Sequence, residues 1–302
     1  MITSLARNGF RIVAAVLVVA VVLHAPPSIA QQPQQKIMTM DADGANLHFV
    51  AHIDGYTRHS VPRWSPDGRD IAFEVSWRES GEYAPRVFKV AATGGEPVDL
   101  GMGKMPSWSM DGKQIVFRIP PDVGESRNGI WIMNSDGASH EFLFPGHQPM
   151  YSPDGAHIAY TNEAQDELFV YDVLEETHRK LSQPYSRIIG YAAWSPDGKE
   201  LCFIGRKDSQ DPELAVTAAD GTQAQPKICV SNKALARYPF WGPSTKILLT
   251  MRTSGNNDQI YTFDPNGKSE PQRFDGQPDA RNFDACWSPD LKKIVFVSDL
   301  SL

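Results

Sequence analysis

The stretch Trp194–Phe203 reads Trp-Ser-Pro-Asp-Gly-Lys-Glu-Leu-Cys-Phe, and it decides the fold of this 302-residue chain. Its first half has the residues of a tight turn. Pro fixes φ, Gly takes a positive φ without steric cost, and the Asp carboxylate accepts from nearby backbone N–H groups. Its second half is a short apolar strand. Copies of this turn-and-strand motif recur every 43–47 residues, beginning at Trp64, Trp108, Tyr151, Trp241 and Trp287.

A second motif alternates with the first. It is a short apolar strand that ends in a polar hairpin turn, as in Ile130–Gly137, Ile-Trp-Ile-Met-Asn-Ser-Asp-Gly. A repeat of about 40–45 residues with several short strands per unit is typical of propeller blades. The sequence therefore predicts an all-β, six-bladed β-propeller of four-stranded blades. The six copies are Ile37–Gly44, Val87–Gly95, Ile130–Gly137, Leu168–Glu176, Leu214–Gly221 and Ile260–Gly267.

The order of the motifs predicts how the ring closes. The first motif, Ile37–Gly44, is a third strand, and the chain ends on a first and a second strand. We therefore expect segment 37–50 to pair with segment 285–298 in one composite blade. Closure in this way removes the exposed sheet edges that favour aggregation. Residues 37–302 are then expected to form a single propeller domain.

The first thirty residues have the composition of a secretory signal peptide. Arg7 and Arg11 precede an apolar run at residues 12–23, and small residues lead to Ala30. These features match the charged, apolar and cleavage regions of such a peptide. A membrane anchor is the alternative, but the run rises only about 18 Å as a helix, short of the roughly 30 Å hydrocarbon core. We expect cleavage after Ala30, a leader at residues 31–36, and a periplasmic or secreted protein with no membrane span after cleavage.

Charge and cysteine content restrict the partners. The formal net charge is −7, and loss of residues 1–30 would make it −9. An acidic protein of this kind is not expected to bind nucleic acid. The chain has three cysteines, Cys202, Cys229 and Cys286, and an odd number is not a disulfide framework. Their spacing is not that of metal ligands either, so we interpret them as thiols that fill core space. We expect a monomer with no cofactor and no metal.

The two alternating motifs, as in residues 194–203 and 37–44, resemble the repeats of the TolB-like six-bladed propeller family. They are also similar to propeller repeats in prolyl-oligopeptidase-type enzymes. The first resemblance implies a periplasmic protein that binds a partner on its propeller, as TolB does in the Tol–Pal system. TolB carries an α/β domain ahead of its propeller. Only residues 31–36 separate the expected cut from the first motif here, so the resemblance implies a Pal-like partner rather than contact with inner-membrane Tol proteins.

Propeller loops lie on two faces, and the irregular loops are the better candidates for binding. The Ser-Pro-Asp-Gly turns and the hairpin turns share one face, which we expect to be structural. The opposite face, the mouth, holds arginines next to the first and second strands, and a guanidinium offers a fork of donors suited to carboxylates. The alternative is that these arginines pair with nearby acids and bind nothing. The candidate binding residues are Arg63, Trp77, Arg118, Arg187, Arg206, Arg237, Arg252 and Arg281.

Two functional hypotheses follow. In the first, the propeller is a binding or scaffold module that docks an envelope protein or an acidic peptide at the mouth, and an anionic glycan is a further candidate ligand. In the second, it is an enzyme acting on an anionic glycan or peptide, which would need groups such as His59 or His147 to converge there. The serines of the turns repeat five times and are expected to be structural. No catalytic residue is assigned.

Overall fold

The computed structural model describes residues 34–123, 127–181, 183–242, 244–266 and 270–301. The predicted signal peptide, residues 1–30, and residues 31–33 of the predicted leader lie outside this part, and so do Pro243 and Gly267 of the repeat motifs. Within the described ranges, no helix is long and apolar enough to cross a membrane.

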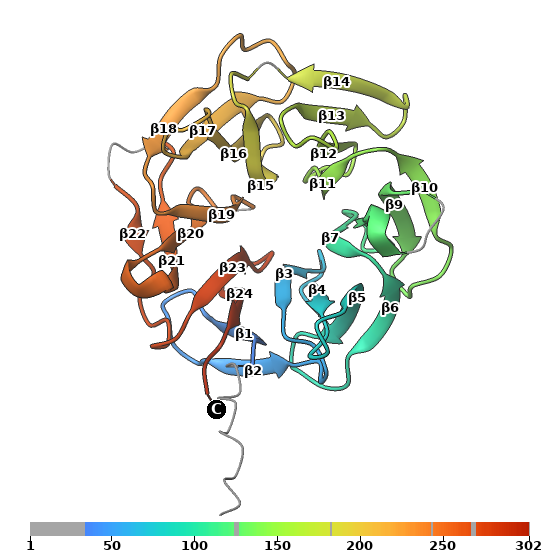
Figure 1. Cartoon of the computed structure of the whole chain (residues 1–302), viewed down its shortest axis with the longest axis vertical. Helices are drawn as coiled ribbons and strands as arrows, with labels where there is room; N and C mark the ends of the chain where they lie inside the picture. Colours follow the sequence, from blue (N-terminus) through green and yellow to red (C-terminus); the bar gives the residue numbers. More distant parts are fainter. Residues whose placement is uncertain (1–33, 124–126, 182, 243, 267–269, 302) are drawn as a thin grey trace, which may run out of the picture. The chain divides into compact units, whose positions relative to one another are not determined.

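Six antiparallel sheets of four strands each surround a common axis (Figure 1). In blades one to five the strands follow chain order from the axis outward. Blade one consists of β3(His59–Trp64), β4(Asp70–Trp77), β5(Tyr83–Ala91) and β6(Val98–Met102). Blade two consists of β7(Lys104–Trp108), β8(Gln114–Ile119), β9(Gly129–Asn134) and β10(Glu141–Phe144). Blade three consists of β11(His147–Tyr151), β12(His157–Thr161), β13(Leu168–Asp172) and β14(Thr177–Leu181).

The remaining blades complete the ring. Blade four consists of β15(Arg187–Trp194), β16(Glu200–Arg206), β17(Glu213–Ala218) and β18(Lys227–Ser231). Blade five consists of β19(Leu235–Phe240), β20(Ile247–Arg252), β21(Asp258–Phe263) and β22(Gln272–Arg273). Blade six consists of β23(Asn282–Trp287), β24(Lys293–Ser298), β1(Lys36–Asp41) and β2(His48–Ala51). Two 3-10 turns, Pro121–Val123 and Ser254–Asn256, are the only helical elements of the described residues. The predicted six-bladed, all-β fold is confirmed.

Blade six joins the two ends of the chain, as the motif order predicts. Strand β1 pairs antiparallel with β24 in a continuous register from Lys36 opposite Ser298 to Asp41 opposite Lys293. The Lys293 ammonium binds the Asp41 carboxylate across this seam. That hydrogen bond, together with one from Asn46, lowers the pKa of Asp41. The N-terminal strand therefore closes the ring through a full ladder of backbone bonds.

The Ser-Pro-Asp-Gly turn is a local hydrogen-bonded unit. In blade four, Ser195 Oγ donates to Asp197 Oδ1 at 2.7 Å and accepts from the Glu200 amide at 2.9 Å. The Ser195 amide in turn donates to the Glu200 carbonyl at 2.8 Å. The same contacts recur at Ser65, Ser109, Ser152 and Ser288. Because each hydroxyl is engaged in holding its turn, these serines are structural.

The blades pack through apolar contacts and through their tryptophans. Ala72 and Val87 of blade one share a buried cluster with Phe117 of blade two. The indole of Trp194 donates to the carbonyl of Met150 in the preceding blade at 3.0 Å. Trp108 makes the equivalent contact with the Arg63 carbonyl at 3.1 Å. Cys202 and Cys286 are buried in the core, and Cys229 is partly buried.

Each innermost strand contains a β-bulge that the sequence analysis did not predict. The register of each first-to-second strand pair slips within the innermost strand, once in five blades and twice in β19 of blade five. A residue with positive φ lies at the slip, three residues before the tryptophan or tyrosine in five blades and at Gly190 in blade four. Bulges re-aim side chains and are common near functional sites. The five non-glycine residues are Val61, Met105, Gln148, Tyr238 and Asp284.

Candidate functional site: an arginine cluster at the seam of blades five and six

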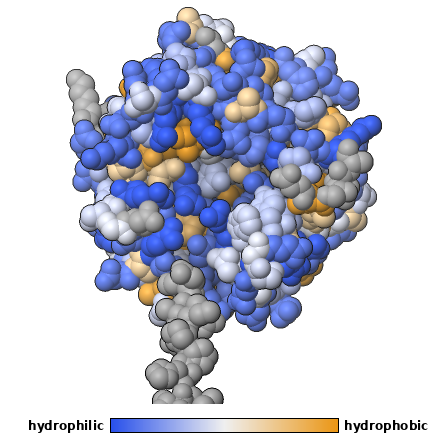
Figure 2. Space-filling model, in the orientation of Figure 1, coloured by the Kyte–Doolittle hydropathy of each residue, from blue (hydrophilic) through white to orange (hydrophobic). Residues whose placement is uncertain are grey.

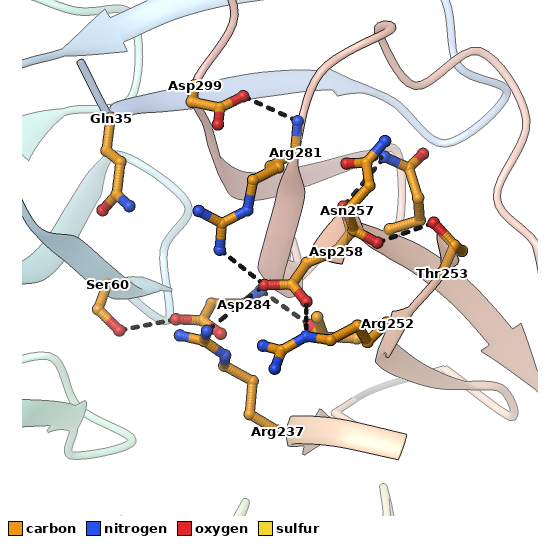
Figure 3. Close-up of polar contacts among 12 residues, drawn as sticks. Gln35, Ser60, Arg237, Arg252, Thr253, Asn257, Asp258, Arg281, Asp284 and Asp299 are labelled. Carbon is orange, nitrogen blue, oxygen red and sulfur yellow. Dashed lines mark hydrogen bonds and ion pairs between the residues drawn. The ribbon is translucent and has the colours of Figure 1, made fainter. Parts of the chain in front are cut away.

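Three arginines converge on one carboxylate at the seam between blades five and six (Figure 3). The Asp258 carboxylate, whose side chain has no exposed surface, accepts from Arg252 Nε at 2.9 Å and from Arg281 Nη2 at 2.8 Å. Arg237 Nη2 lies 3.4 Å from the same carboxylate. We call Arg237, Arg252, Arg281 and Asp258 the arginine cluster.

Three strands of blade five and the segment that precedes β23 of blade six bring these side chains together. Arg252 ends β20 and Asp258 begins β21, and the two residues are direct partners in the register of this hairpin. The loop between them is closed by Thr253, whose hydroxyl donates to the Asn257 carbonyl at 2.8 Å. Arg237 lies on β19, and its guanidinium stacks over a phenyl ring of blade six, 5.0 Å from its centroid. Arg281 directly precedes β23, where its amide donates to the Asp299 carboxylate at 2.8 Å.

The cluster has more positive than negative charge. Burial raises the pKa of Asp258, but hydrogen bonds from Arg252 and Arg281 and the charge of Arg237 outweigh that effect and hold the pKa below its usual value. One ionised carboxylate therefore contacts three guanidiniums, and Arg237 also interacts with the buried carboxyl group of Asp284 in blade six. The side chain of Arg237 is 24% exposed, that of Arg281 33% and that of Arg252 46%, so Arg252 is the most accessible. Unpaired guanidinium N–H groups at a half-exposed site are ready donors for a carboxylate.

The other predicted binding residues are placed differently. Arg118 is buried and pairs with Glu163 at 2.9 Å between blades two and three. Arg187 is exposed and lies 3.5 Å from the Gln165 side-chain oxygen, and Arg206 is exposed at the end of β16. Trp77 is exposed and packs against Tyr83 in the hairpin of blade one. The structure thus brings three of the seven arginines together.

Arg63 does not lie at the mouth with the others. Its side chain is 4% exposed and lines a cavity on the face of the Ser-Pro-Asp-Gly turns. The guanidinium carbon lies 5.0 Å from the Tyr191 ring centroid and 5.1 Å from that of Phe240. Since these rings belong to blades four and five, the Arg63 side chain crosses the axis from blade one. Its position next to Trp64 in sequence did not reveal this direction.

Two buried carboxyl groups lie at the centre of the ring, and sequence reasoning missed both. Asp284 Oδ2 accepts from the Ser60 hydroxyl at 2.7 Å, and Glu74 Oε2 accepts from the Met105 amide at 2.7 Å. Burial raises the pKa of both groups. The negative charge of Asp284 raises the pKa of Glu74 further. A proline two residues before the aromatic residue accompanies the bulge in four blades, but blade six, which holds Asp284, has Ala285 at that position and gives no such signal.

The histidines do not form the constellation that the enzymatic hypothesis requires. His59 Nε2 accepts from the Ile53 amide at 2.9 Å, and burial lowers the pKa of His59 to about 3. Burial likewise lowers the pKa of His147 to about 2. A neutral imidazole engaged by a backbone amide has no lone pair free at that nitrogen for a metal. Among the described residues, no group of three or more His, Cys, Asp or Glu side chains is arranged to hold a metal ion.

Comparison with solved structures defines the class of protein as a six-bladed propeller. A putative TolB from Agrobacterium tumefaciens superposes with a TM-score of 0.68 at 17% identity, covering 89% of this chain and 99% of that one. TolB from Acinetobacter baumannii gives a TM-score of 0.63 at 17% identity over 79% of this chain and 64% of that one. An oligogalacturonate lyase in complex with manganese gives 0.53 at 14% identity, over 88% of this chain and 72% of that one. At these identities the likeness establishes the fold alone.

The family is established by sequence. The TolB beta propeller domain family, PD40, matches residues 122–301, and the chain belongs to it. The uncharacterized peptidase YuxL of Bacillus subtilis is 30% identical over 54% of this chain, and dipeptidyl-peptidase 5 of Porphyromonas gingivalis is 24% identical over 64%. The aligned parts make up 24% and 33% of those two proteins. The chain thus spans between a quarter and a third of the length of these relatives.

Proposed function

We propose that this propeller is an exported binding module that docks a protein or peptide through a carboxylate at the arginine cluster. The observation that carries the proposal is the charge count, because Arg237, Arg252 and Arg281 contact the single carboxylate of Asp258, and the second acid near Arg237, Asp284, is buried with a raised pKa. A docked carboxylate would supply the missing negative charge. The similarity to TolB structures supports a binding or scaffold role.

The cluster is suited to capture because it is preorganised. Asp258 is fully buried and holds in place three guanidiniums from β19, β20 and the segment before β23, so little side-chain entropy is lost on binding. Arg252 is the best first contact, since it is the most exposed of the three and bonds Asp258 through Nε only. Its two Nη groups have no hydrogen-bond partner among the described residues and can form a forked contact with a ligand carboxylate. The partner class is an envelope protein or an acidic peptide that presents such a group.

Export is the second part of this proposal. It rests on the charged, apolar and small-residue regions of residues 1–30 and on the likeness to TolB structures. The expected mature protein begins at Gln31. N-terminal sequencing of protein recovered from the cell envelope would test this part, and a start at Met1 would contradict it.

The test of docking uses immobilised protein covering residues 31–302 to capture partners from an envelope extract. The wild type is compared with Arg252→Glu, which reverses the charge of the most accessible guanidinium. The control is Arg69→Glu, the same change at an 85% exposed side chain on the turn face. We expect a partner that salt releases, that Arg252→Glu loses and that Arg69→Glu retains. Equal retention by all three proteins would contradict the proposal.

An enzymatic function is the second candidate, favoured by the two central carboxyl groups. Asp284 and Glu74 are buried and have raised pKa values, which is a common property of catalytic acids. The peptidase and lyase similarities suggest an anionic glycan or a peptide as substrate. Turnover of oligogalacturonate or of a peptide library by the wild type, and its loss in Asp284→Asn, would establish this function. No turnover of either substrate class would leave the binding module as the sole candidate of the two.

A further inference from the structure

A bowl-shaped cavity lies on the turn face, opposite the arginine cluster. Its volume is about 490 Å³, within the range of roughly 300–1,000 Å³ that is usual for small-ligand pockets. All six blades contribute to its wall, so the bowl is centred on the axis of the ring. Four tryptophans, each at most 9% exposed, contribute to this wall, namely Trp64, Trp108, Trp194 and Trp287. By contrast, the face of the ring drawn in Figure 2 is largely hydrophilic, with apolar patches near a central hollow.

The repeat makes this bowl apolar. The proline of each Ser-Pro-Asp-Gly turn points to the axis side of its blade, and Pro66, Pro153, Pro196 and Pro289 all line the cavity. Blade two has a methionine at this position instead. Met110 is 60% exposed, although methionine side chains are usually covered. A concave wall of indoles, prolines and a thioether favours a flat apolar group, because such groups stack on aromatic faces and release ordered water.

One cation lies in this apolar wall. Arg63 is only 4% exposed, and its Nη1 donates to the Pro62 carbonyl at 3.0 Å. Its Nε and Nη2 atoms are buried and have no hydrogen-bond partner among the described residues. Arg63 also takes part in none of the ion pairs that these residues form. Two unpartnered donors of a charged group in an apolar site are costly unless an anion completes them.

The surroundings of Arg63 leave room for one negative charge. The rings of Tyr191 and Phe240 stack on the guanidinium and supply cation–π contact but no acceptor lone pair in its plane. The buried Cys286 thiol and the Asp284 carboxyl group also interact with it. Asp284 already accepts from Ser60, and burial disfavours the ionised form of both groups. A single carboxylate from a ligand would satisfy both free N–H groups of Arg63.

We propose that the bowl binds a small organic monoanion with a flat apolar body, its carboxylate on Arg63 and its ring system between the indoles. The site is distinct from the arginine cluster and faces the opposite side of the ring. Two sources present this chemistry, a free aryl carboxylic acid and the C-terminal carboxylate of a peptide that ends in an aromatic residue. Both place one anionic group beside one flat apolar group.

Calorimetry with matched probes tests this site. The probes are 2-naphthoate and its neutral amide, and the tripeptide Gly-Gly-Phe as free acid and as C-terminal amide. We expect each acid that binds to exceed its amide by about tenfold in affinity, since a hydrogen bond to a charged group is worth that much. The acid that binds more tightly identifies the source. Equal affinity of acids and amides, or no binding of either acid, would overturn the proposal.

Variants assign the binding to Arg63. In Arg63→Gln the preference for acid over amide should disappear while the amide retains its affinity. Because Arg63 is buried and its loss can impair folding, a rim pair gives a second test. Met110→Glu adds a negative charge at the exposed rim, and Met110→Gln is its neutral match. We expect naphthoate to bind at least about fivefold more weakly to the Glu variant than to the Gln variant, from like-charge repulsion at short range. Equal binding to the two rim variants would contradict the placement of the ligand.

Discussion

Two seams of the ring use arginine in opposite ways. Between blades two and three, Arg118 is buried and pairs with one carboxylate, that of Glu163, at 2.9 Å. Between blades five and six, three arginines share Asp258. The Arg118–Glu163 pair is neutral and its guanidinium is buried, whereas the second seam keeps excess positive charge on partly exposed side chains. The number of carboxylates per guanidinium therefore separates a structural arginine from one that is available to a ligand.

The largest expected effect comes from removing the shared carboxylate. Asp258→Asn would leave three guanidiniums without a counter-charge, and only their partial exposure would limit the cost. We expect the free energy of unfolding to fall by about 2–4 kcal/mol. Urea denaturation would measure the change. A loss below about 0.5 kcal/mol, the range of ordinary surface substitutions, would show that Asp258 does not hold the cluster together.

The matching change at the neutral seam should cost less. Glu163→Gln keeps the shape of the side chain but leaves Arg118 without its counter-charge. Glu163 also accepts from the Gly146 amide at 3.0 Å, a contact that a Gln oxygen can keep. We expect a loss of about 1–2 kcal/mol in the same urea experiment. A cost equal to that of Asp258→Asn would remove the distinction between the two seams.

The pH dependence of stability should also differ between the seams. His147 lies at the neutral seam, where burial and then the charges of Arg118, Lys104 and Arg187 lower its pKa to about 2. Because the unfolded state binds a proton near pH 6.5 and the folded state does not, His147 makes the fold less stable as pH falls from about 6.5. His147→Gln should lessen this slope by up to about 1.4 kcal/mol per pH unit.

Urea unfolding of the wild type and His147→Gln at pH 7, 6 and 5 would measure that slope.

The carboxylate of Asp258 affects stability in a lower pH range than His147. Its pKa is lowered in the fold, so its contribution is present above about pH 4 and is lost as pH falls through the folded pKa. The Asp258→Asn variant should therefore keep the wild-type slope between pH 7 and 5. A flattened slope in Asp258→Asn but not in His147→Gln would contradict the assignment.

The architecture was predictable because each blade carries its own local signals. The turn residues around Ser195 and the strand periods fix a four-stranded unit, and the order of motifs fixes the pairing of β1 with β24. These are interactions between residues close in sequence, or between whole strands. The prediction that the turn face is only structural is incomplete, because the same repeated Trp and Pro residues also form the wall of the bowl.

The site was predictable only in part. Loop position indicated that arginines such as Arg252 and Arg281 flank the inner strands, but not which of them lack a partner. Asp258 binds Arg252 six residues away and Arg281 on the next blade, and the second contact depends on packing that spacing does not show. The prediction that Arg63 lies at the mouth was wrong, because a bulge in β3 re-aims its side chain across the axis. Backbone irregularities of this kind leave only a faint proline signal in the sequence.

The smallest change in stability and the most direct test of docking come from the same residue. Arg252→Gln removes one of three guanidiniums around Asp258 at a half-exposed side chain, so the free energy of unfolding should change by less than about 1 kcal/mol. Its effect should instead appear in binding. Arg69→Gln on the turn face is the matched control, because it removes the same charge far from the cluster.

The measurement is the affinity of a Glu-rich peptide for the wild type, Arg252→Gln and Arg69→Gln by calorimetry at low and high salt. We predict binding that weakens with salt, an affinity about tenfold lower in Arg252→Gln, and no change in Arg69→Gln. If the peptide binds the wild type no better than its Gln-rich analogue, or if Arg252→Gln binds as tightly as Arg69→Gln, the arginine cluster is structural and the central claim is wrong.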